Sequence, residues 1–295
     1  MTTETIPDSA WGQLSQPIHS GAPTTDAPWR DNAFLAFWDP GQDLFGVAHV
    51  STSPNAEGRR ARFSVVLAGQ AMELIEPLER GSFSSEHIGF DVANNTVTVD
   101  APGLKADLAM TPRFVCADYS PTGLIPDLVA DVPLRHFQQG ADISGQLTLG
   151  SERVTVTGQG WRDRSWGPRD ESAAWAEYVA VVACLPDFDL TVMKFRAMDD
   201  KRTTHGFLMY PDHTVTVTGM DLRRDGSGLV NGAVLTTADE QTLTMHMQSA
   251  RGGLWVPMGA GGPPPTFSAY DDAADIELDG QTGAGFSEQG ILRLL

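Results

Sequence analysis

The sequence predicts an all-β protein made of two lipocalin-like, β-sandwich or barrel modules in tandem. Short apolar runs recur along the chain, turn-forming residues such as Gly and Pro stand between them, and no long stretch shows helical periodicity. Short strands separated by turn residues are typical of sandwiches and barrels. The length of 295 residues fits two such modules, and a hydrophobic content of 41% is ordinary for a globular protein.

Residues 1–28 are rich in Pro, Ser and Thr and show little periodicity, so we expect a flexible N-terminal tail there. A first β module is expected over residues 29–133, and its first strand ends at the turn sequence Asp39-Pro40-Gly41. The predicted strands of this module are Phe34–Trp38, Leu44–Val50, Arg62–Leu67, Ala71–Ile75, Thr96–Val99 and Leu104–Met110. The proline-marked stretch 121–133 is the predicted connection to the next module.

A second, lipocalin-like β module is expected over residues 134–295, and we expect it to carry the functional site. Its predicted strands are Phe137–Leu149, Arg153–Trp161, Trp175–Cys184, Leu190–Arg196, Gly206–Tyr210, Thr214–Met220, Val230–Thr237, Leu243–Met247 and a closing strand within Gly283–Leu295. Each run is rich in β-branched or aromatic residues, which favour strands.

Composition excludes several classes of partner. A net charge of -18 argues against nucleic acid and anionic membranes, because phosphate binding needs basic patches. No apolar run reaches the ~18 residues of a membrane span, so no integral membrane span is expected. Cys116 and Cys184 lie in apolar runs, which predicts reduced, buried thiols. The N-terminal residues lack the basic and apolar regions of a signal peptide, so a cytoplasmic protein is expected. No cofactor and no metal are expected. The sequence leaves open whether the protein forms a homodimer.

The most distinctive segment is Gly158–Asp170, which directly follows a strand pattern. Its last ten residues hold two tryptophans, three arginines and two aspartates. Aromatic walls around a few charged groups are typical of a binding or catalytic site. Strand alternation places the two sets of side chains on opposite faces: Gln159, Trp161, Asp163 and Ser165 on one, Arg162, Arg164 and Trp166 on the other.

Asp163 is the candidate general acid of this segment. Indole neighbours would remove water from its carboxyl group and raise its pKa, and arginines that face away would not oppose this shift. A hairpin between Gln139 and Gln159 would bring His136 beside Asp163, where His136 would orient or deprotonate a water. Trp161 would stabilise a cation through its ring face.

Two elements carry a resemblance to a known family. His136-Phe-Gln-Gln139 and Gly158-x-Gly-x-x-Asp163-x-Ser-Trp-Gly167 resemble elements of the lipocalin-like carotenoid hydratase superfamily, in particular its bacterial members of undefined function. The resemblance implies tandem β modules around an apolar pocket. It also implies a proton donor at Asp163, an aromatic group facing the cation at Trp161 and a water-handling histidine at His136. Arg164 replaces the family's usual histidine, and Gln138 replaces an aromatic residue, so a differently shaped apolar substrate is expected.

The sequence therefore predicts a cofactor-independent hydratase or dehydratase that acts on a hydrophobic isoprenoid-, steroid- or polyketide-like small molecule. An isomerase or cyclase acting on the same substrates, or a non-catalytic carrier of apolar ligands, are the alternatives. The expected substrate-binding side chains are Gln138, Gln159, Ser165, Trp166, Trp175 and Tyr178, and the expected structural network is Arg162, Arg164, Arg169 and Asp170. Alternation places Trp175 and Glu177 on one face of their strand and Tyr178 on the other.

Overall fold

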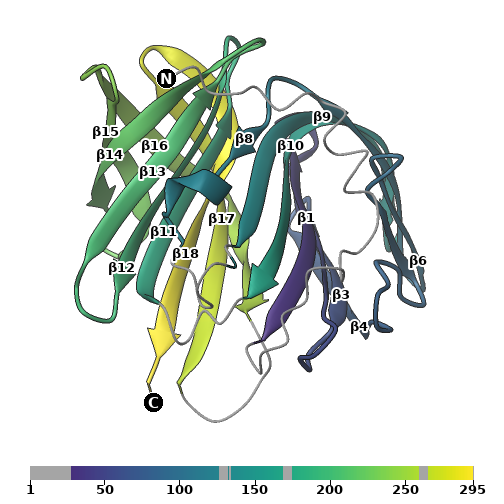
Figure 1. Ribbon diagram of the computed structural model, residues 1–295. Coiled ribbons are helices and arrows are strands. Elements are labelled where there is room, and N and C mark those ends of the chain that lie inside the picture. Colours follow the sequence, from purple (N-terminus) through teal and green to yellow (C-terminus); the bar gives the residue numbers. More distant parts are fainter. Residues whose placement is uncertain (1–27, 126–131, 133, 169–174, 259–264, 295) are drawn as a thin grey trace. The chain divides into compact units, whose positions relative to one another are not determined.

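The computed structural model describes residues 28–125, 132, 134–168, 175–258 and 265–294, and these fold almost entirely into antiparallel β-strands (Figure 1). The chain divides between Asp170 and Glu171 into two compact units. The predicted all-β fold with two modules in tandem is confirmed. Residues 1–27 of the predicted tail, and Arg169 and Asp170 of the predicted network, lie outside the described residues.

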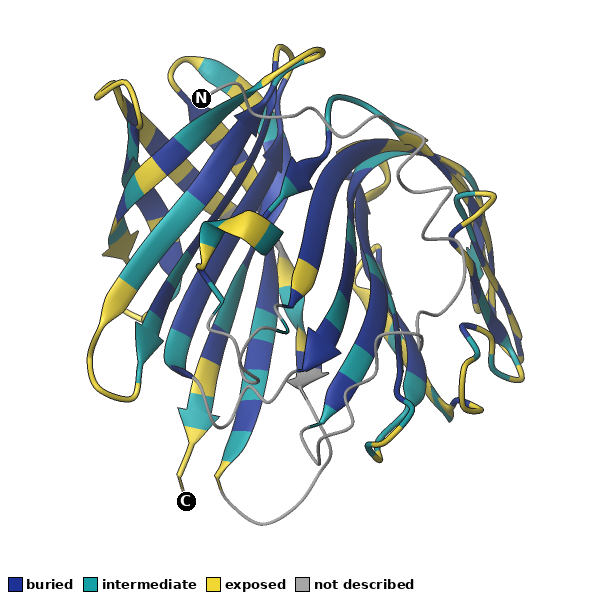
Figure 2. Cartoon of the chain, in the orientation of Figure 1, coloured by how far each residue is buried: buried dark blue, intermediate teal, exposed yellow. Residues whose placement is uncertain are grey.

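The N-terminal unit is a ten-stranded antiparallel sheet with the order β4-β3-β2-β1-β10-β9-β7-β6-β5, and β8 pairs with β9. The bounds are β1 Trp29–Asp39, β2 Leu44–Thr52, β3 Arg60–Leu67, β4 Gln70–Pro77, β5 Ile88–Asp91, β6 Thr96–Ala101, β7 Leu104–Pro112, β8 Ala117–Asp118, β9 Arg135–Leu149 and β10 Glu152–Pro168. Strand β7 alternates between buried and exposed positions, whereas β1 is buried along nearly its whole length (Figure 2). Continuous burial indicates that β1 is covered on both faces.

The predicted turn after β1 is present. The short 3-10 helix η1 (Pro40–Gln42) begins after Asp39, whose Oδ1 accepts a hydrogen bond of 3.1 Å from the Gly41 N–H. Asp43 ends the turn in the left-handed conformation, with φ of 50°. An aspartate cap followed by proline sets this geometry locally, which is why the sequence predicts it.

The boundary between the modules is a correction to the sequence prediction. The sequence placed it at residues 133/134, so that β9 and β10 opened the C-terminal module. In the structure β10 pairs with β1, Trp29 opposite Pro168 through Trp38 opposite Gln159, and therefore completes the N-terminal sheet. The pairing joins segments about 130 residues apart, and no local pattern encodes it. The segment that carries Asp163 thus belongs to the N-terminal unit.

The C-terminal unit is a closed antiparallel barrel in which consecutive strands are neighbours and β18 returns to β11. The bounds are β11 Trp175–Cys184, β12 Asp189–Ala197, β13 Arg202–Met209, β14 Thr214–Arg224, β15 Val230–Thr237, β16 Thr242–Met258, β17 Thr266–Leu278 and β18 Gln281–Arg293. Closure requires glycine in β18, because a Cβ at Gly285 would lie 1.9 Å from the Val182 carbonyl oxygen. An apolar core that includes Val181, Val192 and Leu235 lies inside the barrel.

The sequence prediction missed three strands. β5 and β8 are only four and two residues long, and β17 contains Asp271 and Asp272, which are 0% and 3% exposed. Acidic residues are depleted in strands, so strand propensity does not predict β17.

Cys116 and Cys184 are both buried thiols, as predicted. Within the described part of the chain, no helix has the length and apolar character that crossing a membrane requires.

Candidate functional site

The hairpin of β9 and β10 brings the candidate acid and base together. Asp163 lies opposite Gln138, and Ser165 lies opposite His136, so His136 and Asp163 are diagonal neighbours on one face of the sheet. His136 Nε2 lies 2.5 Å from Asp163 Oδ2, and Gln138 Nε2 donates a hydrogen bond of 3.0 Å to the same oxygen. At 2.5 Å the carboxylate oxygen and the imidazole nitrogen are within hydrogen-bond distance, so a proton can pass directly between the two groups.

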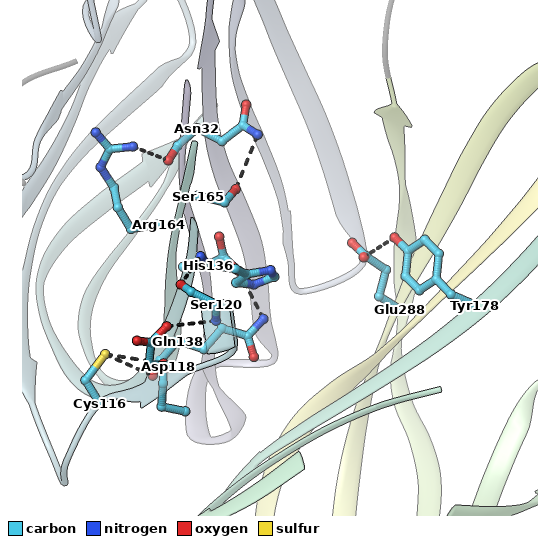
Figure 3. A network of polar contacts seen from close by, with 12 residues as sticks. Asn32, Cys116, Asp118, Ser120, His136, Gln138, Arg164, Ser165, Tyr178 and Glu288 are labelled. Atoms are coloured by element: carbon cyan, nitrogen blue, oxygen red, sulfur yellow. Dashed lines mark hydrogen bonds and ion pairs between the residues drawn. The ribbon is translucent and has the colours of Figure 1, made fainter. Parts of the chain in front are cut away.

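The segment around β8 fixes the position of His136. The Tyr119 N–H donates to the His136 carbonyl oxygen at 2.9 Å, and the His136 N–H donates to Ser120 Oγ at 3.1 Å (Figure 3). The Tyr119 and His136 rings lie 5.5 Å apart. Sequence reasoning missed Tyr119 and Ser120. The short apolar run Phe114–Ala117, followed by Ser120 and Pro121, is the signal by which this strand and turn could have been found.

The arginines beside Asp163 point to the opposite face, as the alternation predicts. Arg162 donates to Gln139 Oε1 at 3.0 Å and to Asn95 Oδ1 at 2.6 Å. Arg164 pairs with Asp31, and both side chains are 0% exposed. The contacts of both arginines thus lie on the face opposite to the one where Asp163 meets His136 and Gln138.

The site is enclosed rather than open to bulk water. The side chains of His136 and Asp163 are 10% and 15% exposed, and Trp161 is 0% exposed. Two buried polar atoms, His136 Nδ1 and Trp161 Nε1, have no hydrogen-bond partner among the described residues. Buried polar groups are normally paired, so these two atoms are suited to a polar group of a bound molecule.

The remaining predicted side chains of β10 divide between the faces. Ser165 is buried and its Oγ accepts a bond of 3.4 Å from Asn32 Nδ2 (Figure 3). Gln159 is half-buried and lies opposite Asp142. Trp166 stacks on Phe137 at 5.4 Å and packs against the N-terminal core, on the face away from Asp163.

The other two predicted binding residues, Trp175 and Tyr178, belong to strand β11 of the C-terminal unit. Their rings are 5.8 Å apart, which corrects the expectation that they occupy opposite faces of β11. A β-bulge between Trp175 and Glu177 inserts one extra residue and reverses the alternation there. The Tyr178 hydroxyl donates to Glu288 Oε1 (Figure 3). Trp175 packs against aromatic neighbours in tilted or edge-on arrangements, with the Phe195 ring centre at 4.7 Å.

Within the described residues, the one group of His, Cys, Asp or Glu side chains spaced closely enough to hold a metal ion is Glu76, Glu86 and His87. It includes neither Asp163 nor His136.

A family model described as "Domain of unknown function (DUF7064)" matches residues 18–291. The chain belongs to the DUF7064 family. No curated protein matches the chain by sequence.

Solved structures show what fold this DUF7064 protein shares with others. CghA has a TM-score of 0.67 and 14% identity, with coverage of 100% of this chain and 94% of that chain. A protein assigned as AttH from Nitrosomonas europaea has a TM-score of 0.62 and 17% identity, covering 92% and 98% of the two chains. Kievitone hydratase from Nectria haematococca has a TM-score of 0.59 and 10% identity, covering 98% and 95%. At these identities the likeness establishes the fold, and it confirms the fold expected from the hydratase-like sequence elements.

Proposed function

We propose that this DUF7064 protein is a hydratase or dehydratase that acts on a hydrophobic small molecule by general-acid catalysis from Asp163. The observation that carries the proposal is the contact of 2.5 Å between Asp163 Oδ2 and His136 Nε2, formed on a face from which Arg162 and Arg164 are turned away. An arginine paired with the carboxylate would hold it ionised, whereas a histidine partner exchanges a proton with it.

The pair supplies both proton transfers of a hydration. In the hydration direction the Asp163 carboxyl gives its proton to one carbon of a double bond, and a cation forms on the neighbouring carbon. A water then adds through its oxygen to that cation and releases a proton to His136. The short contact returns this proton from His136 to Asp163, so atoms and charge balance over one cycle. Dehydration runs the same steps in reverse.

The surroundings of the pair favour this chemistry. Trp161 is fully buried and lies two residues before Asp163 on the same strand face, where an indole ring is placed to stabilise a cation by up to ~2 kcal/mol. Gln138 donates to the carboxylate at 3.0 Å and orients it. His136 Nδ1 is buried without a partner among the described residues and is available to a water or a substrate hydroxyl. No step of this cycle draws on a cofactor.

The relatives in fold lend support of a general kind. Kievitone hydratase is a hydratase by name. A second structure of CghA contains the compound Sch210972, and its fold matches this chain with a TM-score of 0.64. The fold is therefore compatible with hydratase chemistry and with binding of a small molecule. From the sequence elements, isoprenoid-, steroid- or polyketide-like compounds are the substrate class we propose. Loss of a proton from the cation to His136, without addition of water, would make the same pair an isomerase or cyclase.

The experiment is a panel of unsaturated and hydroxylated isoprenoids, steroids and polyketides incubated with the protein in ²H₂O and analysed by mass spectrometry. Wild type should add or remove the elements of water, or should incorporate deuterium at carbon. Asp163→Asn keeps the shape of the side chain but has no acidic proton, and it should lower turnover by about 10²- to 10⁴-fold.

The matched control is Asp142→Asn, which alters an exposed carboxylate on the adjacent strand β9 and should leave turnover unchanged. Equal turnover in Asp163→Asn and wild type would refute the proposed role. Tight binding of panel members with no product from wild type would instead favour a carrier.

A further inference from the structure

The inner face of the C-terminal barrel changes character along the barrel. One row of neighbouring positions across β11 and β12 is apolar, with Val181 opposite Val192. The next row pairs Val179 with both Lys194 and Gln289. Because side chains two positions apart share a face, the following row places Glu177, Arg196 and Arg202 side by side on the same inner face. The barrel therefore has an apolar interior and a charged mouth.

A cavity lies at this mouth. It has a volume of about 620 Å³ and is lined by residues that include Glu177, Arg224, Trp255, Tyr270 and Gln289. An adjoining cavity of about 360 Å³ shares Glu177 and Arg224 with it. Small-molecule sites commonly occupy ~300–1,000 Å³, and the interior of an eight-stranded barrel is large enough for one small ligand.

The charge of the mouth opposes that of the whole chain. The two cavities are lined by five cationic side chains and two carboxylates, namely Lys194, Arg196, Arg202, Arg224 and Arg293 against Glu177 and Asp221. The whole chain has 20 Lys and Arg residues against 38 Asp and Glu residues. A local excess of cations in a strongly acidic protein attracts an anion to this one place.

Arg224 occupies the centre of this arrangement. Its guanidinium donates to Glu177 Oε1 at 2.9 Å, to the Gly228 carbonyl oxygen at 2.7 Å and to Gln289 Oε1. Glu177 is also 3.6 Å from Arg196, so one carboxylate serves two guanidinium groups. The Arg224 side chain is 32% exposed, and it can reach an incoming anion.

Two inward-facing polar atoms near Arg224 also indicate a ligand site. Gln289 Nε2 is buried without a hydrogen-bond partner among the described residues, although Gln289 Oε1 binds Arg224. Ser287 Oγ, two positions deeper on β18, is likewise buried and unpartnered within the described part of the chain. A buried amide N–H and a hydroxyl left without partners are suited to the oxygens of a ligand.

The rim of the cavity offers apolar contact. Trp255 and Ile291 are 55% and 43% exposed, so two large apolar side chains contact solvent at this rim. The Trp255 ring lies 5.2 Å from the Tyr270 ring, and the Arg293 guanidinium lies 5.5 Å from the centre of the Trp255 ring. An apolar ligand body would cover this rim.

We propose that the barrel mouth is a second binding site, which takes an amphipathic anion with one carboxylate on an apolar body. The carboxylate lies between Arg224 and Arg196 and accepts from Gln289 Nε2, while the body lies against Trp255 and Ile291. This site consists of residues of the C-terminal unit alone and does not depend on the proposed chemistry of Asp163.

Isothermal titration calorimetry of the full chain with dodecanoate, kept below its critical micelle concentration, tests the proposal. Dodecan-1-ol is the neutral probe of equal length. Dodecanoate should bind one to one, and dodecan-1-ol at least tenfold more weakly. Arg224→Gln should weaken dodecanoate on the order of tenfold or more, because a charge-assisted pair is lost. Arg223→Gln, the same change at the next residue of β14 on the opposite face, should leave the affinity unchanged.

Circular dichroism of each variant verifies that the barrel is folded. Equal affinity for the acid and the alcohol, no binding of dodecanoate, or equal effects of Arg223→Gln and Arg224→Gln would overturn the proposal. Asp163→Asn should bind dodecanoate like wild type. A loss of turnover in Asp163→Asn with intact dodecanoate binding therefore separates this site from the proposed catalytic one.

Discussion

Asp31→Asn is expected to be among the most destabilising single changes in the N-terminal unit. Asp31 pairs with Arg164, and both side chains are 0% exposed. The Arg164 guanidinium also donates to the Asn32 carbonyl oxygen at 2.8 Å and lies 4.9 Å and 5.3 Å from the centres of the Phe83 and Trp166 rings. The variant keeps the shape of the side chain but removes the negative charge that Asp31 places against the buried guanidinium.

The magnitude follows from this burial. Removing one partner of a buried ion pair costs about 3–5 kcal/mol, because the remaining charge cannot recover its hydration. The neutral amide of asparagine does not replace the carboxylate, so we expect the full range rather than the small effect of a surface pair. For a domain of this size about 2–4 °C of Tm is lost per kcal/mol, which gives a decrease of roughly 6–20 °C.

Urea denaturation followed by tryptophan fluorescence measures the effect. The tryptophans that report on the N-terminal sheet are Trp29, Trp38, Trp161 and Trp166. Asp100→Asn is the control, since Asp100 and its partner Lys105 are 80% and 67% exposed and the midpoint should not move. Asp31→Leu combined with Arg164→Met should recover much of the lost stability. A loss below about 1 kcal/mol in Asp31→Asn would refute the reasoning, because that is the cost of an exposed pair.

Two further outcomes concern backbone packing and pH. Gly158→Ala should destabilise the N-terminal sheet by about 1–3 kcal/mol, because the new Cβ would lie 2.0 Å from the Trp38 carbonyl oxygen; Gly226→Ala, which meets nothing within 4 Å, should have little effect in the same urea titration. Burial lowers the pKa of His205 below its usual value of 6.5, so the unfolded chain takes up this proton at a higher pH than the barrel does. The barrel should therefore lose stability as pH falls through about 6.5, and His205→Gln should reduce the slope of unfolding free energy against pH between about 5 and 7; an unchanged slope would contradict this.

The sequence by itself determined most of the strands and the two faces of β10. Alternation along β10 separates Asp163 from Arg162 and Arg164, and the structure places these side chains on opposite faces as expected. The hairpin of β9 and β10 is local, so its register follows from the pattern of the two strands and brings His136 to Asp163. Properties that depend on side-chain period and short loops are encoded within a few residues.

Only the tertiary structure decided which distant strands meet. The pairing of β1 with β10 moved the boundary between modules from 133 to 170 and supplied Asp31 as the partner of Arg164. The closure of β18 on β11 likewise gathered Glu177, Arg224 and Gln289 at one barrel mouth. Many strands have equivalent apolar faces and edges, so the choice among partners depends on the packing of the whole sheet. No local segment of the sequence encodes this packing.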